Sequence, residues 1–78
     1  MFLPHEDIRA RHAAGVQFDT HLIPNPGNTR EWIVLLKKGV GTSYFLIDEQ
    51  DEVESFADLN ALIDELRQLG IKHAEIHC

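Results

Sequence analysis

The stretch that most constrains this chain is residues 30–38, which read REWIVLLKK. Its β-branched and aromatic residues favour a β-strand, and a second such stretch follows at 43–48 after the glycine-containing turn 39–42. The two are predicted to form an antiparallel hairpin. In both stretches consecutive residues are apolar, so each strand carries apolar side chains on both of its faces. A strand with one face in water instead alternates apolar with polar residues. Both faces of this sheet therefore need cover.

The clearest helix is predicted over residues 55–69. Apolar residues recur there at steps of three and four, and form one stripe of Phe56, Leu59, Leu62, Ile63, Leu66 and Leu69. Ser55 followed by Asp58 fits the spacing of a capping box at a helix start. Gly70 supplies a left-handed residue to end the helix, and Ile71 can pack back on Leu66. We expect the apolar stripe to face the sheet.

The other segments complete an α+β fold. We predict a short helix over 4–14, a strand over 16–23, a loop over 24–28 and a closing edge strand over 71–77. The element order is then α-β-β-β-α-β, in a single domain that covers residues 1–78. The predicted architecture is a small sandwich, with a mainly antiparallel sheet and one strong amphipathic helix packed on it.

The cover for this sheet is uneven. Helix 55–69 can cover one side, and the other has only the thin helix 4–14 together with Phe2 and Leu3. Burying a leucine or tryptophan side chain is worth about 1.5–3 kcal/mol, so leaving several exposed is a sizeable penalty. We therefore expect a homodimer at micromolar concentration, or a heterologous partner on the same face, with the N-terminal segment as the competing cover.

The charge is acidic and unevenly placed. The net charge of −6 divides into +1 over residues 1–42 and −7 over residues 43–78. Six carboxylates fall within eleven residues, at Asp48, Glu49, Asp51, Glu52, Glu54 and Asp58. A negative field of this kind repels phosphate backbones and favours basic partners. We therefore assign these six residues as the protein-binding site; the alternative is a solvated turn whose acids favour a helix N-terminus.

The chain lacks the sequence features of several classes of protein. The longest apolar run, residues 32–36, is five residues long, too short to span a membrane, and the N-terminus shows no secretory signal. The lone Cys78 cannot form an internal disulfide, which points to a reducing, cytoplasmic location, and as a terminal thiol it is a poor candidate nucleophile. Serine catalysis has only Ser43 and the predicted cap Ser55 available. We expect no enzymatic activity and no cofactor.

The C-terminal His73, Glu75 and His77 form the sharpest candidate for a metal site. On a strand His73 and His77 lie about 13 Å apart, so only neighbours two residues apart could share an ion. Two ligands are too few, and a third would have to come from His5, His12 or His21. We therefore expect no metal site and polar side chains on the solvent face of an edge strand.

The helix-strand-strand-strand-helix order resembles that of double-stranded-RNA-binding domains over nearly the whole chain, in element order alone. Those domains carry a basic cluster at the start of their last helix, where this chain has Asp51, Glu52 and Glu54. The only basic pair is Lys37 and Lys38 near the hairpin turn. We expect no direct binding of nucleic acid.

In size, acidity and lack of a catalytic constellation, the chain resembles small accessory proteins of bacterial plasmids and phages. Some of these, anti-CRISPR inhibitors among them, block a basic nucleic-acid-binding surface of a host complex. We interpret the protein as a non-catalytic, acidic protein-interaction module, an inhibitor of this type. The alternative is a small regulatory protein that binds metal or nucleic acid directly.

Overall fold

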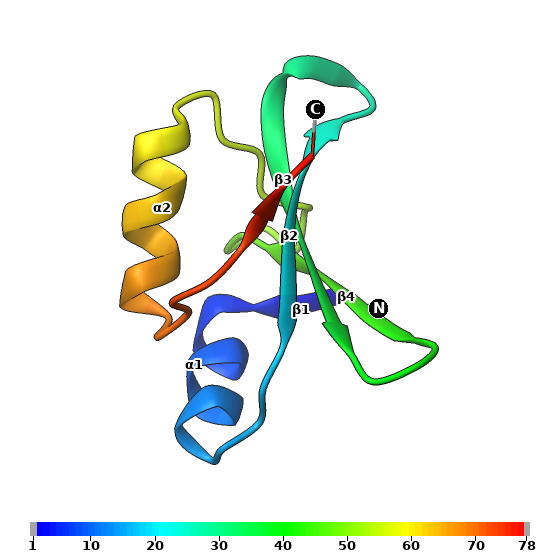
Figure 1. The fold of residues 1–78 in the computed structure, drawn as a ribbon. Helices are drawn as coiled ribbons and strands as arrows, with labels where there is room; N and C mark the ends of the chain where they lie inside the picture. The colour runs from blue at the N-terminus through cyan, green and yellow to red at the C-terminus, as the bar shows by residue number, and fades with distance from the viewer. Residues whose placement is uncertain (1, 78) are drawn as a thin grey trace.

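Five strands and two helices make up residues 2–77, the part of the chain that the computed structural model describes (Figure 1). In chain order they are β1 (Phe2–Pro4), α1 (His5–Ala13), β2 (Asp19–Asn25), β3 (Asn28–Lys38), β4 (Thr42–Ile47), α2 (Leu59–Gln68) and β5 (Glu75–Ile76). The strands form one mixed sheet in the order β1-β4-β3-β2-β5.

The predicted order α-β-β-β-α-β and the mainly antiparallel sheet are wrong. The described chain begins with strand β1, which pairs in parallel with β4, and β5 pairs in parallel with β2 at the opposite edge. Only the inner pairs β2–β3 and β3–β4 are antiparallel. β1 escapes sequence analysis because it is three residues long, ends in Pro4 and finds its partner Phe45 far along the chain.

The predicted hairpin is confirmed over half its length. β3 and β4 pair from Leu35↔Phe45 to Lys38↔Thr42, on either side of a turn in which Gly39 has a positive φ of 64°. On the side of the Leu35↔Phe45 pair that is away from the turn, β3 and β4 are no longer paired. Segment 53–56 hydrogen-bonds there to both strands. The Glu54 N–H donates to the Leu46 carbonyl at 2.9 Å, and Phe56 pairs with Trp32 as an isolated bridge.

The start of the long helix differs from the prediction for the same reason. α2 begins at Leu59, not at residue 55, because the backbone of Phe56 is bound to β3. Its cap is Asp58, whose Oδ1 accepts a hydrogen bond from the Asn60 N–H at 2.9 Å. The predicted cap Ser55 instead accepts a hydrogen bond from Nδ2 of Asn25 at 3.0 Å.

The predicted end of this helix is confirmed. Gly70 has a φ of +88°, its N–H donates to the Arg67 carbonyl at 3.0 Å, and the Ile71 N–H donates to the Leu66 carbonyl at 2.9 Å. This pair of bonds is the Schellman motif, which satisfies carbonyls that a helix end would otherwise leave open. Ile71 is buried and belongs to the core, as the motif's hydrophobic contact requires.

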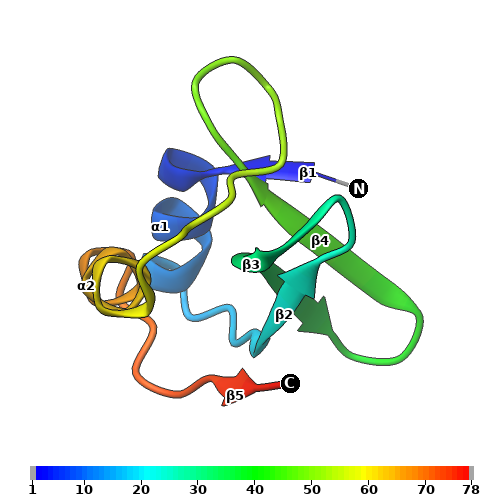
Figure 2. The same ribbon diagram turned by 90° about the horizontal axis from the view of Figure 1, so that it is seen from above.

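Both helices lie on the same face of the sheet, so the core is one-sided (Figure 2). The fully buried Ile8 of α1 and Leu62 of α2 belong to one cluster with Leu22, Val34 and Leu36 of the sheet. Helix α1 therefore does not cover the second face, and of the N-terminal segment named as the competing cover, strand β1 contributes Phe2 to that face. Neither helix of residues 2–77 is long and apolar enough to cross a bilayer.

Candidate functional site

The acidic run lies in the loop between β4 and α2, beside a surface hollow of about 890 Å³. The junction of β1 and α1 forms the other wall. The charged side chains that line the hollow are the acids Glu6, Asp48, Glu49, Asp51, Glu54 and Glu65 and the bases His5 and Arg9. The excess of carboxylates gives the hollow a negative field.

Two of the predicted binding residues have a structural role. Oδ1 of Asp48 accepts hydrogen bonds from the N–H groups of Gln50 and Glu52, at 2.9 and 3.1 Å, and so holds the turn that starts the loop. Asp58 is the cap of α2 and lines no part of the hollow. The structure therefore separates Asp58 from the rest of the acidic run.

Glu54, which lines the hollow, is paired with His5. Nε2 of His5 lies 2.5 Å from Oε1 of Glu54, and Nδ1 of the same ring lies 2.6 Å from Oε1 of Glu65. All three side chains are about three-quarters buried. His5 thus joins α1, the acidic loop and α2, a role that the sequence pattern did not indicate because the three residues lie far apart in the chain.

Glu49, Asp51 and Glu52 are the exposed members of the run. Among residues 2–77 none of the three takes part in an ion pair. Asp51 has a φ of 62°, a left-handed conformation that aspartate tolerates better than most residues, and it marks the tip of the turn. These three carboxylates are therefore exposed and lie outside every ion pair of the described residues.

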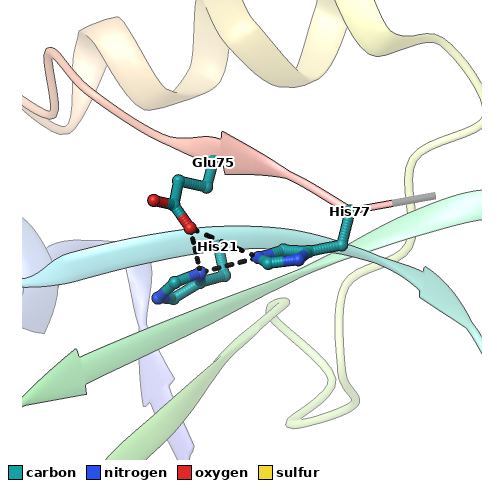
Figure 3. A group of neighbouring side chains, drawn as sticks. All are labelled: His21, Glu75 and His77. Carbon is teal, nitrogen blue, oxygen red and sulfur yellow. Dashed lines mark hydrogen bonds and ion pairs between the residues drawn. The ribbon is translucent and has the colours of Figure 1, made fainter.

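A second cluster lies at the opposite edge of the sheet, where β5 pairs with β2 (Figure 3). Nδ1 of His21 lies 2.8 Å from Nε2 of His77 and 3.4 Å from Oε2 of Glu75, and the last two atoms are 3.7 Å apart. His21 is 9% exposed, whereas Glu75 and His77 are on the surface. The three groups converge on one point.

His73 lies outside this cluster, although the sequence placed it with Glu75 and His77. The predicted closing strand over 71–77 is present only as the two residues of β5, so His73 lies before the strand, whereas the predicted edge position is confirmed. His21 is the residue that sequence analysis named only as one of three distant candidates. It joins the cluster because its register partner in the parallel pairing is Glu75.

The sheet face away from the helices is apolar, and we call it the open face. By strand register it carries Phe2, Ile23, Ile33, Leu35, Phe45 and Ile47, and His21 lies on the same face near the β5 edge. Ile33 and Ile47 are buried, so the exposed apolar area comes from Phe2 and from the partly exposed Ile23, Leu35 and Phe45. Phe2 is 59% exposed, and its ring centroid lies 6.4 Å from that of Phe45. The acidic loop borders this face, because Val53 pairs with Ile47 and is itself exposed. An apolar area with an acidic margin is thus present on one side of the molecule.

The candidate nucleophiles of the sequence show no shared site. Ser43 is an exposed residue of β4, and Ser55 is engaged with Asn25 as described. Cys78 lies outside the described residues. Within residues 2–77 the side-chain hydrogen bond of a serine hydroxyl is that of Ser55 with the Asn25 amide, which is not a base.

Comparison of the chain with protein-family models, with curated proteins and with solved structures found no match. Two arrangements of side chains in the described residues are candidate sites: the acidic loop beside the open face, and the cluster of His21, Glu75 and His77 at the other edge of the sheet.

Proposed function

We propose that the protein is a non-catalytic interaction module that binds a basic surface of another protein through its acidic loop, residues 48–54. One observation carries the proposal: Glu49, Asp51 and Glu52 are exposed without ion-pair partners in the described chain, beside a hollow already lined with carboxylates. Carboxylates gathered in this way raise the local concentration of cationic groups and speed their association.

The neighbouring open face supports a protein partner over a small cation. Protein interfaces combine an apolar centre with a polar rim, and here Val53 and Phe2 supply exposed apolar area next to the acids. A field of this sign opposes nucleic acid, whose backbone carries one negative charge for every phosphate. A basic protein surface satisfies both features.

More specifically, we propose that the protein is an inhibitor of the kind that plasmids and phages encode. Such an anti-CRISPR-like protein would occupy the nucleic-acid-binding surface of a host complex. Carboxylates presented along a loop can fill positions on such a surface that otherwise receive phosphates. A cytoplasmic location belongs to the same proposal, because nucleic-acid-binding complexes work there and the chain has a single cysteine.

The test uses matched charge reversals. The chain is immobilised and exposed to nuclease-treated bacterial lysate, and the same is done with an Asp51→Lys, Glu52→Lys double variant. The control is Asp7→Lys with Asp64→Lys, which changes the net charge equally at exposed helix positions away from the hollow. Glu6 is unsuitable as a control because it lines the hollow.

We expect a basic protein to be captured by the wild type and by the control, and lost from the loop variant. Its binding should weaken steeply as salt rises, since exposed charges are screened within about 8–10 Å at physiological ionic strength. Added nucleic acid should displace the protein from its partner. Equal capture by both double variants, or binding that does not change with salt, would contradict the proposal and show that the acidic run is only a solvated turn.

The alternative function, direct metal binding by a small regulatory protein, is favoured by a different observation, the convergence of His21, Glu75 and His77. It concerns the other edge of the sheet and does not exclude a protein partner at the loop.

A further inference from the structure

Three groups that ligate zinc meet where β5 joins the sheet. The atoms nearest their common point are Nδ1 of His21, Nε2 of His77 and Oε2 of Glu75, and their separations are 2.8, 3.4 and 3.7 Å. They come from two strands, and Figure 3 shows both rings and the carboxylate directed toward one another. The acidic loop is at the far edge of the sheet, so this cluster is a separate site.

The separations are close to those of a zinc site. Tetrahedral ligands at bond lengths of about 2.0–2.1 Å lie roughly 3.3–3.4 Å from each other. The two distances to Glu75 are near that value, and the two rings would need to separate by about half an ångström. Two imidazoles and one carboxylate are a donor set that zinc uses with water or another ligand in the fourth position.

Backbone pairing holds these residues in place. His21 and Glu75 are register partners in the parallel ladder, and the His77 N–H donates to the Leu22 carbonyl at 2.9 Å. Glu75 and His77 are two residues apart on an extended segment, so their side chains fall on the same side. The sheet therefore brings the three ligands together without help from an ion.

A carboxylate also stands behind the buried ring. Nε2 of His21 lies 3.1 Å from Oδ2 of Asp19, which precedes it by two residues on β2. In the structure this nitrogen has no well-aligned hydrogen bond. A carboxylate beside the non-ligating nitrogen is the usual way in which proteins orient a metal-bound histidine and raise its basicity.

We propose that His21, Glu75 and His77 bind a zinc ion, through Nδ1, a carboxylate oxygen and Nε2 respectively. This inference goes beyond the proposed interaction function and is independent of it. It also replaces the expectation of no metal site, which allowed Glu75 and His77 to share an ion but did not expect His21 to supply the third ligand. The bound ion would fasten the two-residue strand β5 to β2 and so stabilise the C-terminal segment against local unfolding.

The alternative is a metal-free cluster. One imidazole can donate a hydrogen bond to the other across the 2.8 Å contact, while Glu75 pairs with whichever ring is charged. Such a cluster would show no preference for zinc over magnesium, a cation that favours oxygen ligands and keeps its water. Zinc binding that depends on these three side chains therefore distinguishes a zinc site from a metal-free cluster.

The experiment titrates ZnCl₂ into the full chain carrying Cys78→Ser, so that the terminal thiol cannot supply a ligand. Calorimetry should give one equivalent of zinc, and cobalt should give the absorption spectrum of a tetrahedral ion. At a hundredfold excess of zinc over Kd, the Tm should rise by roughly 10 °C or more, and magnesium should leave it unchanged.

The variants His77→Gln and Glu75→Gln remove one ligand each at exposed positions and leave the core intact. Each should abolish the tetrahedral cobalt spectrum and weaken zinc binding at least as much as loss of an orienting group, about 10–100-fold. His73→Gln is the matched control on the same segment, and should bind zinc as the wild type does. The absence of stoichiometric binding, or binding that survives both ligand variants, would overturn the proposal.

Asp19→Asn tests the positioning residue. It should weaken zinc binding about 10–100-fold while the Tm of the metal-free protein stays the same, because Asp19 is exposed and acts only through His21. Wild-type affinity in this variant would remove Asp19 from the site, and leave the three ligands to be judged by their own substitutions.

Discussion

Trp32 and Phe56 exchange two backbone hydrogen bonds, each N–H donating to the other residue's carbonyl at 2.8 Å. This pairing keeps segment 53–56 extended alongside β3, so α2 begins only at Leu59, after its cap Asp58. The helix boundary is thus decided by a contact between residues 24 positions apart in the sequence, and not by the local capping pattern at Ser55.

The first prediction concerns the helix cap. Asp58→Ala should destabilise the protein by about 1 kcal/mol, because the Asn60 N–H loses its acceptor at the helix start. Chemical denaturation measures the free energy of unfolding, and the Asn60 amide signal in NMR spectra reports the lost bond. Ser55→Ala, the control, should leave the Asn60 signal in place since Ser55 bonds to Asn25. The reverse pattern would restore Ser55 as the cap.

The second prediction concerns the one-sided core. Leu62→Ala or Leu66→Ala should each destabilise by about 2–5 kcal/mol, because both side chains are buried between α2 and the sheet. For a domain this small such a loss threatens folding. Gln68→Ala, at an exposed position of the same helix, should change stability by less than about 0.5 kcal/mol. Losses below about 1 kcal/mol at both leucines would place this helix face on the surface.

The third prediction concerns the helix end. Gly70 has a φ of +88°, and an added Cβ would clash with Cδ2 of the His12 ring. Gly70→Ala should destabilise by about 1–2 kcal/mol through backbone strain, with a further loss as the His12 ring is displaced. Gly15→Ala is the matched control, since its φ is +92° and nothing lies within 4 Å.

Urea unfolding of both alanine variants, with and without His12→Ala, separates the two effects. The extra loss at Gly70 should disappear when the His12 ring is removed, while the strain remains at both glycines. A neutral Gly70→Ala would contradict the left-handed helix end.

The parts of the fold that were predictable rest on local signals. The stop at Gly70 and Ile71 needs only the conformational freedom of glycine and one apolar contact, both readable within six residues. The hairpin of β3 and β4 likewise follows from two apolar runs around a glycine turn. In each case the interacting groups are neighbours in the sequence.

The parts that were missed depend on distant pairs. β1 is too short to show a period, and only Phe45 and Leu46 reveal that Phe2 and Leu3 form a strand. His21 is an ordinary position of an alternating strand until β5 places Glu75 beside it. The acidic run could be found from the sequence alone. The contacts of His5 with Glu54 and Glu65 could not, because they form only when α1, the acidic loop and α2 come together. Such pairings are set by the whole core, which no short window contains.

The last prediction concerns the open face. Because both helices lie on the opposite side, the exposed Phe2 and the half-buried Phe45 and Leu35 are left with no helix over them in the described chain. We expect self-association through this face, with a mass near twice 8.9 kDa in light scattering at micromolar concentration and above. Phe2→Ser should shift the mass toward the monomer. Val40→Ser, which alters an equally apolar but separate hairpin tip, should not.

The salt dependence of this dimer distinguishes it from the proposed partner complex. Each chain carries a net charge of −6, so two copies repel each other, and screening by added salt should strengthen the dimer. A complex between the acidic loop and a basic protein should weaken under the same change. Trp32 fluorescence does not report on this association, since Trp32 faces the helices and packs against the core in the single chain. A mass that stays at 8.9 kDa at all salt and protein concentrations would show that the twisted sheet and β1 suffice to shield this face in the monomer.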